Sequence, residues 1–248
     1  MQIIYILWLR QLKRYFRSKA RIIGSLGQPL LFMFAFGFGF GSIYSQAGEG
    51  DYIQFLVPGV ICMTILFTSV FSGLEIIWDR QFGFLKEMLV APVPRLKIMI
   101  GRSLGGATLA VLQGVLVLGL SFLVGFRLHN PWGLIPAIGF MFLIAFLFTL
   151  FGTAIASRLK DAQGFQLIMN FLVMPMLFLS GAFFPIDILP KTVYTIISLN
   201  PLAYGVDAIR GALVGLNHFP QFTSLSILTI ITILLLFISS LLFSKIEA

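Results

Sequence analysis

The sequence predicts an all-α, polytopic integral membrane protein that forms a single transmembrane domain over residues 1–248. Three observations support this prediction: 58% of the residues are hydrophobic, only 10% are charged, and 27 are phenylalanine. Soluble domains contain about 25% charged residues, so this chain has too few polar groups to cover a water-facing surface. The composition therefore excludes a water-soluble enzyme, a disordered chain and, because Cys62 is the single cysteine, a disulfide scaffold.

Six continuous apolar segments are long enough to cross the hydrocarbon layer as helices. A crossing helix needs about 20 mostly apolar residues, whereas a membrane strand would alternate polar and apolar residues over about ten positions. The predicted crossings are residues 22–44, 53–77, 103–126, 132–156, 164–183 and 222–243.

The basic residues predict that both termini are cytoplasmic. With the N-terminus inside, 14 of the 17 Lys and Arg residues fall in cytoplasmic segments, and only Arg127, Lys191 and Arg210 fall outside. Positive residues concentrate in the cytoplasmic loops of membrane proteins. The net charge of +8 is therefore attributed to topology, and no nucleic-acid partner is expected.

Residues 1–21 predict an amphipathic helix that lies on the inner membrane surface. Its cations follow helical spacing on one face: Arg10, Lys13, Arg14 and Arg17. Aromatic and apolar residues occupy the opposite face: Tyr5, Trp8, Leu12 and Phe16. Such a helix places its aromatic residues in the lipid boundary and its cations near anionic headgroups, so membrane lipids are expected partners. A simple topology anchor is an equally supported and compatible interpretation.

The outer segment, residues 184–221, is apolar but contains proline and charged residues. They are Pro185, Pro190, Asn200, Pro201, Asp207, Arg210 and His218. Each charge at the bilayer centre costs about 2.5–3.5 kcal/mol, which argues against a seventh crossing. We expect short re-entrant helices, broken at Pro201, with their irregular backbone buried in protein or facing water.

Four amides within the predicted crossings are candidates for a substrate path: Gln28, Gln113, Gln166 and Asn170. Amides in membrane helices more often join helices by hydrogen bonds, and that interpretation is favoured here. No set of His, Cys, Asp and Glu residues has metal-binding spacing, so neither a metal site nor a catalytic site is predicted.

Residues 101–108 resemble a phosphate-binding loop, but Ala107 stands where the motif requires lysine. We interpret these residues as small side chains for close helix packing, and we predict no ATP site in this chain. The glycine pair Gly101 and Gly105 has the spacing that allows two helices to approach closely.

The loop at residues 75–97 is the most informative segment. It interleaves acids and bases with apolar residues, and two prolines, Pro92 and Pro94, end its helix. Exposed apolar groups rimmed by charge usually mark a partner site. The alternative is an interfacial helix on lipid, which would favour a uniformly basic face over this mixed charge.

Two stretches of this chain resemble a known family. Residues 78–92, WDRQFGFLKEMLVAP, resemble the loop signature of the ATP-binding-cassette type-2 permeases, nearest the daunorubicin-resistance and nodulation-export branch. Residues 179–185, LSGAFFP, and 199–210, LNPLAYGVDAIR, resemble the region between that family's fifth and sixth crossings. The similarity extends over nearly the whole chain.

The resemblance implies a homodimer in the bacterial inner membrane that binds a separate ABC ATPase subunit. ATP and Mg would be bound by that subunit, with no cofactor in this chain. The implied binding surface for the ATPase, a coupling helix, consists of Glu75, Trp78, Asp79, Arg80, Phe82, Phe84, Leu85, Lys86, Glu87, Met88 and Pro92. The N-terminal helix is implied as a second contact with the ATPase.

The predicted function is the non-enzymatic permease subunit of an ATP-driven exporter that moves a drug-like or amphipathic substrate outward. An exporter of lipid-linked polysaccharide with the same fold is the alternative. A wide channel lined by aromatic residues would favour the glycan, and a closed apolar dimer seam would favour the drug. A membrane enzyme or assembly scaffold that needs no ATPase remains a third hypothesis, of another class.

Overall fold

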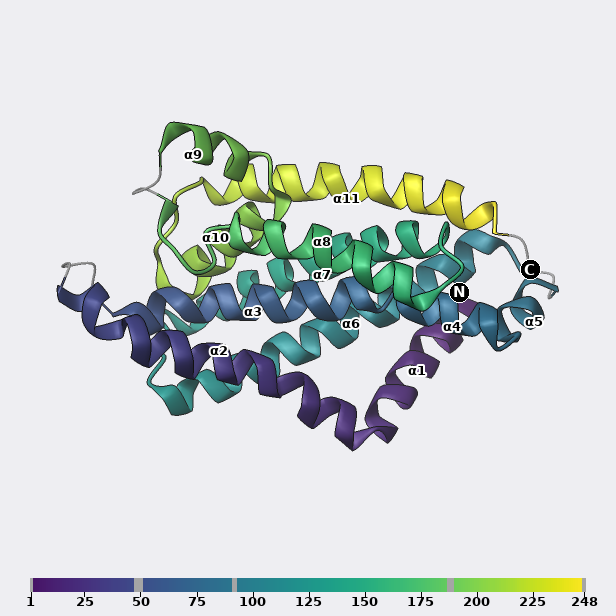
Figure 1. Cartoon of the computed structure of the whole chain (residues 1–248), viewed down its shortest axis with the longest axis horizontal. Helices are drawn as coiled ribbons and strands as arrows, with labels where there is room; N and C mark the ends of the chain where they lie inside the picture. The colour runs from purple at the N-terminus through teal and green to yellow at the C-terminus, as the bar shows by residue number, and fades with distance from the viewer. Residues whose placement is uncertain (1, 47–50, 91–92, 187–189, 247–248) are drawn as a thin grey trace.

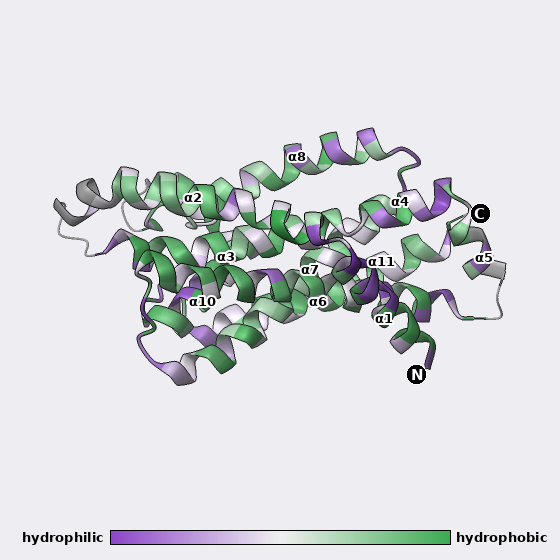
Figure 2. Ribbon diagram, turned by 90° about the horizontal axis from the view of Figure 1, so that it is seen from below, coloured by the Kyte–Doolittle hydropathy of each residue, from purple (hydrophilic) through white to green (hydrophobic). Residues whose placement is uncertain are grey.

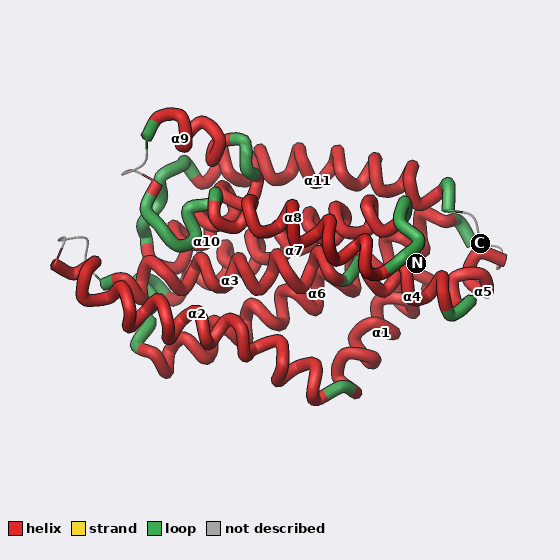
Figure 3. The backbone as a smooth tube through the Cα atoms, viewed as in Figure 1, coloured by secondary structure: helices red, strands yellow, loops and turns green. Residues whose placement is uncertain are grey.

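The computed structural model describes residues 2–46, 51–90, 93–186 and 190–246, and every regular element in those ranges is helical (Figure 3). The all-α prediction is thereby confirmed. The N-terminal half contains α1 (Gln2–Arg17), α2 (Lys19–Gln46), α3 (Tyr52–Phe71), α4 (Leu74–Gln81), α5 (Phe84–Val90) and α6 (Arg95–Ser121). The C-terminal half contains α7 (Leu134–Ala156), α8 (Ala162–Phe178), α9 (Lys191–Ser198), α10 (Pro201–Val214) and α11 (Gln221–Ser244), and the 3-10 turns η1 (Phe122–Val124) and η2 (Pro131–Gly133) lie between α6 and α7.

Among the described residues, five helices are long and apolar enough to cross a membrane. They are Ile22–Gly41, Tyr52–Gln81, Arg95–Val124, Pro131–Ala156 and Gln221–Ser244. Each corresponds to a predicted crossing. The remaining predicted crossing, 164–183, corresponds to α8, which is apolar but has only 17 residues and spans about 25 Å.

The predicted crossings differ from the structure mainly at their ends. The second crossing was expected to end at residue 77, but it bends at Ser72 and Gly73 and continues as α4 to Gln81. The fifth ends five residues early, because the chain turns after α8 and Gly181 takes a left-handed φ of +71°. Glycine adopts that conformation without strain, which explains its place in this turn.

Helix α3 is the centre of the bundle and is buried against α2, α6, α7 and α10. Its closest contacts are made where glycines leave room for a neighbouring backbone. A Cβ at Gly59 would lie 2.2 Å from the Ala182 carbonyl oxygen, and one at Gly73 would lie 2.6 Å from the Gly152 carbonyl oxygen. Any larger residue at these positions would push the helices apart, so glycine fixes how closely α3 packs against the turn after α8 and against α7.

The helices run along the long axis of the molecule, and their ends form two distinct regions. Helix α1 begins and α11 ends at the end that carries α4 and α5, whereas α9 and α10 lie at the opposite end (Figure 1). Hydrophobic residues dominate the helices between these ends, and hydrophilic residues gather around α1, α4 and α5 (Figure 2). We refer to the first region as the α4–α5 end and to the second as the α9–α10 end.

The segment between α8 and α11 folds into the two short helices expected there. The side chain of Asn200 caps α10 by accepting a hydrogen bond from the Leu202 N–H, and Pro201 occupies the first helical position. Proline fits at this position because it has no N–H to leave unsatisfied. The break between α9 and α10 therefore falls at Pro201, as the sequence predicts.

Candidate functional site

Helix α1 packs against α6 within the protein. Gly101 and Gly105 of α6 allow the approach: Cβ atoms there would lie 3.0 Å from the Ile4 carbonyl oxygen and 2.7 Å from the Gln11 side chain. The indole N–H of Trp8 donates a hydrogen bond of 3.0 Å to the hydroxyl of Thr108. The small residues of 101–108 thus serve helix packing, as predicted, and they lie within α6 and not in a loop.

An ionic cluster joins α1 to α4 and α6 at the α4–α5 end. Arg102 of α6 lies 2.7 Å from Asp79 of α4, and both residues are buried. Arg10 of α1 approaches the other oxygen of the same carboxylate at 3.6 Å. Arg14 lies 3.7 Å from Glu75 and 3.9 Å from Asp79. We call these five residues the ionic cluster. Its side-chain ion pairs hold α1, α4 and α6 together.

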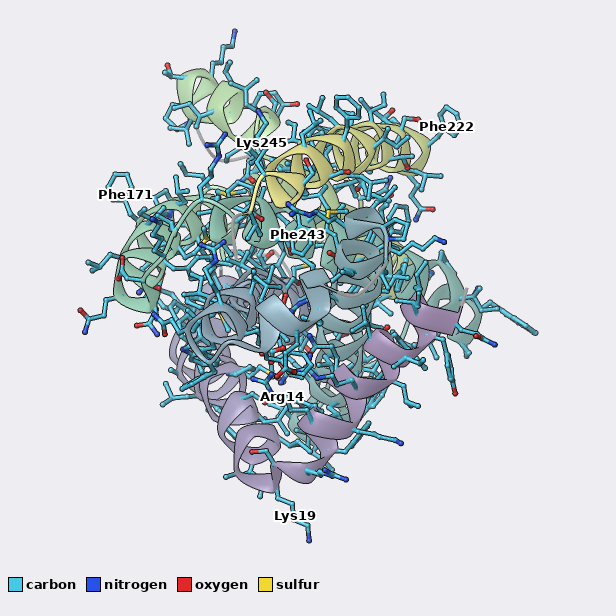
Figure 4. The ribbon with its side chains drawn as sticks, turned by 90° about the vertical axis from the view of Figure 1, so that its right-hand side faces the viewer. Arg14, Lys19, Phe171, Phe222, Phe243 and Lys245 are labelled. Carbon is cyan, nitrogen blue, oxygen red and sulfur yellow. The ribbon has the colours of Figure 1, made fainter. Side chains whose placement is uncertain are left out.

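The predicted face of four cations on α1 is divided in two. Arg10 and Arg14 turn inward to the ionic cluster, whereas Lys13 and Arg17 are exposed. Figure 4 shows Arg14 directed toward the bundle and Lys19 pointing away from it. The aromatic and apolar face of α1 is likewise divided between residues that contact the bundle and residues that are exposed.

Trp8 contacts α6 and does not face outward as the amphipathic pattern suggests. Tyr5 and Phe16 are exposed, while the buried residues of α1 are Leu7, Gln11 and Tyr15. The helical periodicity of α1 was predicted correctly, but its apolar stripe covers α6, because the small residues of α6 let a neighbouring helix approach.

The predicted coupling segment consists of two parts with different surroundings. In α4, Glu75 and Asp79 are buried in the ionic cluster. Arg80 donates hydrogen bonds to the carbonyl oxygens of Leu159, at 3.1 Å, and Ser157, at 3.3 Å, which follow α7. The charges of α4 are thus used to hold the end of the bundle together.

The second part is the turn at Phe82 and Gly83 followed by α5, which we call the elbow (residues 82–90). Phe82 is 83% exposed, and Glu87 is exposed, whereas Leu85 is fully buried. The ring of Phe84 lies 3.8 Å beneath the guanidinium of Arg10, so the elbow is tied to α1. Of the other predicted residues, Met88 is partly buried, the side chain of Lys86 is outside the described part, and Pro92 lies outside the described residues.

A cavity of about 520 Å³ lies beside the ionic cluster, between α1, α2, α3, α4, α6 and α8. Three of the four amides predicted from the sequence line it: Gln28, Gln113 and Asn170. The fourth, Gln166, is exposed on α8 and does not line the cavity. Trp78, the remaining residue of the predicted coupling segment, forms part of its wall, as does Glu75.

Gln113 is the centre of a buried hydrogen-bond network at this cavity. Its amide nitrogen donates to the hydroxyl of Tyr15 at 3.0 Å and to that of Ser25 at 2.7 Å. Its carbonyl oxygen accepts a hydrogen bond from the hydroxyl of Thr68. Gln113 therefore joins α6 to α1, α2 and α3, which is the helix-joining role favoured for such amides.

The α9–α10 end contains two buried charged residues that bind the backbone. Asp207 accepts hydrogen bonds of 2.8 Å from the N–H groups of His218 and Phe219. Arg210 donates to the carbonyl oxygens of Phe55, at 3.3 Å, and Gly181, at 2.9 Å. In the sequence, both residues argue against a seventh crossing and lie in the 199–210 stretch that carries the family resemblance. Their charge within a predominantly apolar segment is the signal that could have marked them as structural anchors.

The described residues contain no group of three or more His, Cys, Asp and Glu side chains that could hold a metal ion. They form a helical bundle whose long helices are apolar enough to cross a membrane, with a largely apolar cavity that three amides line and with one end held together by ion pairs.

The family model of the ABC-2 type transporter matches residues 2–214. The transport permease YadH of Escherichia coli strain K12 is 27% identical over 230 residues, which cover 90% of this chain and 88% of YadH. The protein ycf38 of Cyanophora paradoxa, also named as a transport permease, is 30% identical over 216 residues, covering 84% of this chain and 73% of ycf38. Nodulation protein J of Rhizobium leguminosarum bv. viciae is 26% identical over 199 residues, covering 79% and 76%.

The chain belongs to the ABC-2 type transporter family. It is a multi-pass membrane permease, and the family comprises transport permeases and not enzymes. Permeases of this family normally work with an ATPase subunit.

Proposed function

We propose that this chain is the permease subunit of an ATP-driven exporter, and that a separate ATPase binds at the elbow. The α4–α5 end would then be cytoplasmic, with both termini on that side. The cargo would be an amphipathic molecule that leaves the inner leaflet or the cytoplasm and moves outward. ATP and Mg would be bound by the ATPase, so that this chain supplies binding and movement but no hydrolysis.

The observation that carries the proposal is that the elbow combines an exposed aromatic residue with a buried anchor. Phe82 is a large aromatic residue that is 83% exposed, while Leu85 three residues later is fully buried and anchors the same segment. An aromatic side chain that projects from an anchored element is typical of the residues that contribute most to protein–protein binding. The exposed carboxylate of Glu87 provides a charge on the same short helix.

The elbow is connected to the cavity through the ionic cluster. Arg10 contacts both the ring of Phe84 and the carboxylate of Asp79, while Arg14 contacts Glu75, which lines the cavity. Closure of the ATPase around ATP would move the elbow, and these contacts would carry that movement to α1 and the cavity wall. A ligand can shift such an equilibrium only by its differential affinity for the two states, which here is supplied by ATP.

A second copy of this chain and the surrounding lipid complete the proposal. Gln166 and Phe171 are exposed on α8, with Phe171 79% exposed and directed outward (Figure 4). An amide that faces hydrocarbon without a partner is costly, so α8 is the surface we assign to a second copy. The exposed Lys13 and Arg17 would contact anionic lipid headgroups at the membrane surface.

The test is co-purification and ATP hydrolysis with an ABC ATPase that is co-expressed with this permease. We expect Phe82→Ala to weaken binding of that ATPase to the permease in nanodiscs by about 10- to 30-fold, as for truncation of a central aromatic residue. The matched control is Leu123→Ala, because Leu123 is also 83% exposed but lies near the α9–α10 end.

Equal binding of the ATPase by wild type and Phe82→Ala would contradict the elbow as its binding surface. Full transport activity by a permease that binds no ATPase would contradict the exporter itself, and it would favour a membrane enzyme or a scaffold.

A further inference from the structure

Two amides face the cavity without a hydrogen-bond partner among the described residues. Gln28 of α2 and Asn170 of α8 are exposed and line the cavity where it opens at the surface, whereas the third amide, Gln113, is buried and fully used in joining helices. Amide groups that lack partners within a membrane cost free energy until they are hydrogen-bonded. The cavity therefore presents both donors and acceptors to whatever occupies it.

The charge of the cavity is balanced within the chain. Glu75 is the single charged residue among those that line it, and its carboxylate lies 3.7 Å from the guanidinium of Arg14. A cationic occupant would have to compete with Arg14 for this carboxylate, and an anionic one would meet it directly. The cavity is therefore not complementary in charge to either a cationic or an anionic occupant.

The remaining wall is apolar and aromatic. Phe67 and Phe71 stack with ring centroids 6.2 Å apart, and Trp78 lies on the wall close to the elbow. The volume, about 520 Å³, falls within the range of sites that hold a drug-sized molecule. Aromatic faces next to hydrogen-bonding amides suit a molecule with one apolar part and one polar, uncharged part.

We propose that the cavity binds the uncharged head of an amphiphile, a head that carries hydroxyl or amide groups, and that it discriminates against cationic amphiphiles. Gln28 and Asn170 are the specificity-determining residues: they hydrogen-bond to the head, while Phe67, Phe71 and Trp78 contact its apolar part. This inference rests on the proposed function, because it identifies the class of cargo that the exporter would carry.

The test uses Trp78 as a reporter in the full-length permease, reconstituted in lipid nanodiscs without nucleotide or ATPase. Trp8→Phe and Trp132→Phe leave Trp78 as the single tryptophan of the chain. Two probes share one brominated alkyl tail that quenches tryptophan emission; one has a glucoside head, and the other has a trimethylammonium head. Competition by the same glucoside without bromine separates cavity binding from random quenching in the lipid.

We expect saturable, competable quenching by the glucoside and at least tenfold weaker binding of the ammonium probe. Gln28→Leu combined with Asn170→Leu should weaken glucoside binding by about tenfold, the effect of two modest hydrogen bonds. Gln163→Leu is the control, because Gln163 is exposed on the same helix as Asn170 and does not line the cavity. Tighter binding of the ammonium probe, or unchanged glucoside binding by the double variant, would overturn the inference.

A second variant guards against misfolding of the first. Asn170→Asp keeps the size of the side chain and adds a charge, so it should raise the affinity for the ammonium probe and lower that for the glucoside. An unchanged order of preference would overturn the assignment of Asn170. Since binding is measured without the ATPase, its outcome is separate from that of Phe82→Ala, which tests coupling.

Discussion

The fully buried charges at the two ends of the bundle have different kinds of partner, although the partly buried Arg80 of the α4–α5 end also donates to main-chain carbonyl oxygens. At the α4–α5 end, Asp79 is shared between Arg10 and Arg102, so that side chains from three helices hold one another. At the α9–α10 end, Asp207 and Arg210 bind main-chain groups of neighbouring turns. Ion pairs between side chains join helices that can still shift relative to one another, whereas hydrogen bonds to backbone groups hold the main chain of a turn in one conformation.

This difference indicates which end can move as a unit. The turns at the α9–α10 end are defined by hydrogen bonds to individual carbonyl and N–H groups, which have little freedom to change partners. The arginines of the ionic cluster are long and can exchange between the oxygens of Glu75 and Asp79. We therefore expect substitutions at the first end to affect coupling and stability together, and those at the second to affect mainly stability.

The largest effect is expected for Asp79→Asn. It leaves Arg102 buried without its counter-charge, and breaking a buried pair by removing one partner typically costs about 3–5 kcal/mol of stability. Thermal unfolding in nanodiscs measures the loss. Asp79→Leu combined with Arg102→Met removes both charges and should recover most of it. If the double variant were no more stable than Asp79→Asn, the pair would not be the unit that matters.

A smaller loss is expected for Arg210→Met. The methionine fills the volume, but the carbonyl oxygens of Phe55 and Gly181 lose a donor, which costs about 2–3 kcal/mol. The stimulation of the partner ATPase by cargo should be retained once the protein is kept folded at low temperature. Stimulation lost at full stability would show that the α9–α10 end takes part in coupling and would remove the contrast drawn above.

The smallest effect is expected on the exposed side of α1. Lys13→Gln with Arg17→Gln should change stability by less than ~0.5 kcal/mol in zwitterionic nanodiscs, because neither side chain has a hydrogen bond or ion pair in the described part of the chain. In anionic lipid the unfolding midpoint of the wild type should rise relative to this variant. The inward-facing Arg14→Gln provides the comparison, with a larger loss in both lipids.

Much of the fold follows from the sequence because hydrophobic length alone defines a crossing. The predicted segment 132–156 and the observed Pro131–Ala156 differ by one residue. The break at Pro201 was equally accessible, since Asn200 and Pro201 form a helix start that local chemistry determines. The end of the second crossing was predicted four residues early, at residue 77, because the charged residues of α4 suggest that the chain has already left the membrane, whereas the helix continues to Gln81.

The site was predictable only in part, because burial of charge depends on partners distant in the sequence. The sequence suggests that Glu75 and Asp79 are exposed acids of a loop. In the structure both are buried, and Arg102 of the next crossing neutralises Asp79, which offsets the cost of burying its carboxylate. The amides were identified from their position within apolar segments, but that pattern does not separate Gln113, which joins helices, from Gln28 and Asn170, which face the cavity. Only the packing of α1, α2 and α8 around α3 distinguishes them.

The contact between Gly73 and Gly152 has a mechanical consequence. It lies at the bend between α3 and α4, where two backbones touch with no side chain between them. The eight residues of α4 form an arm about 12 Å long beyond this fulcrum. A tilt of about 10° at the fulcrum would displace the tip of the arm by about 2 Å, while α3 stays in register with α7. Gly152→Ala would place a Cβ about 2.3 Å from the Val70 carbonyl oxygen, so it would push α7 away from α3 and disturb this pivot.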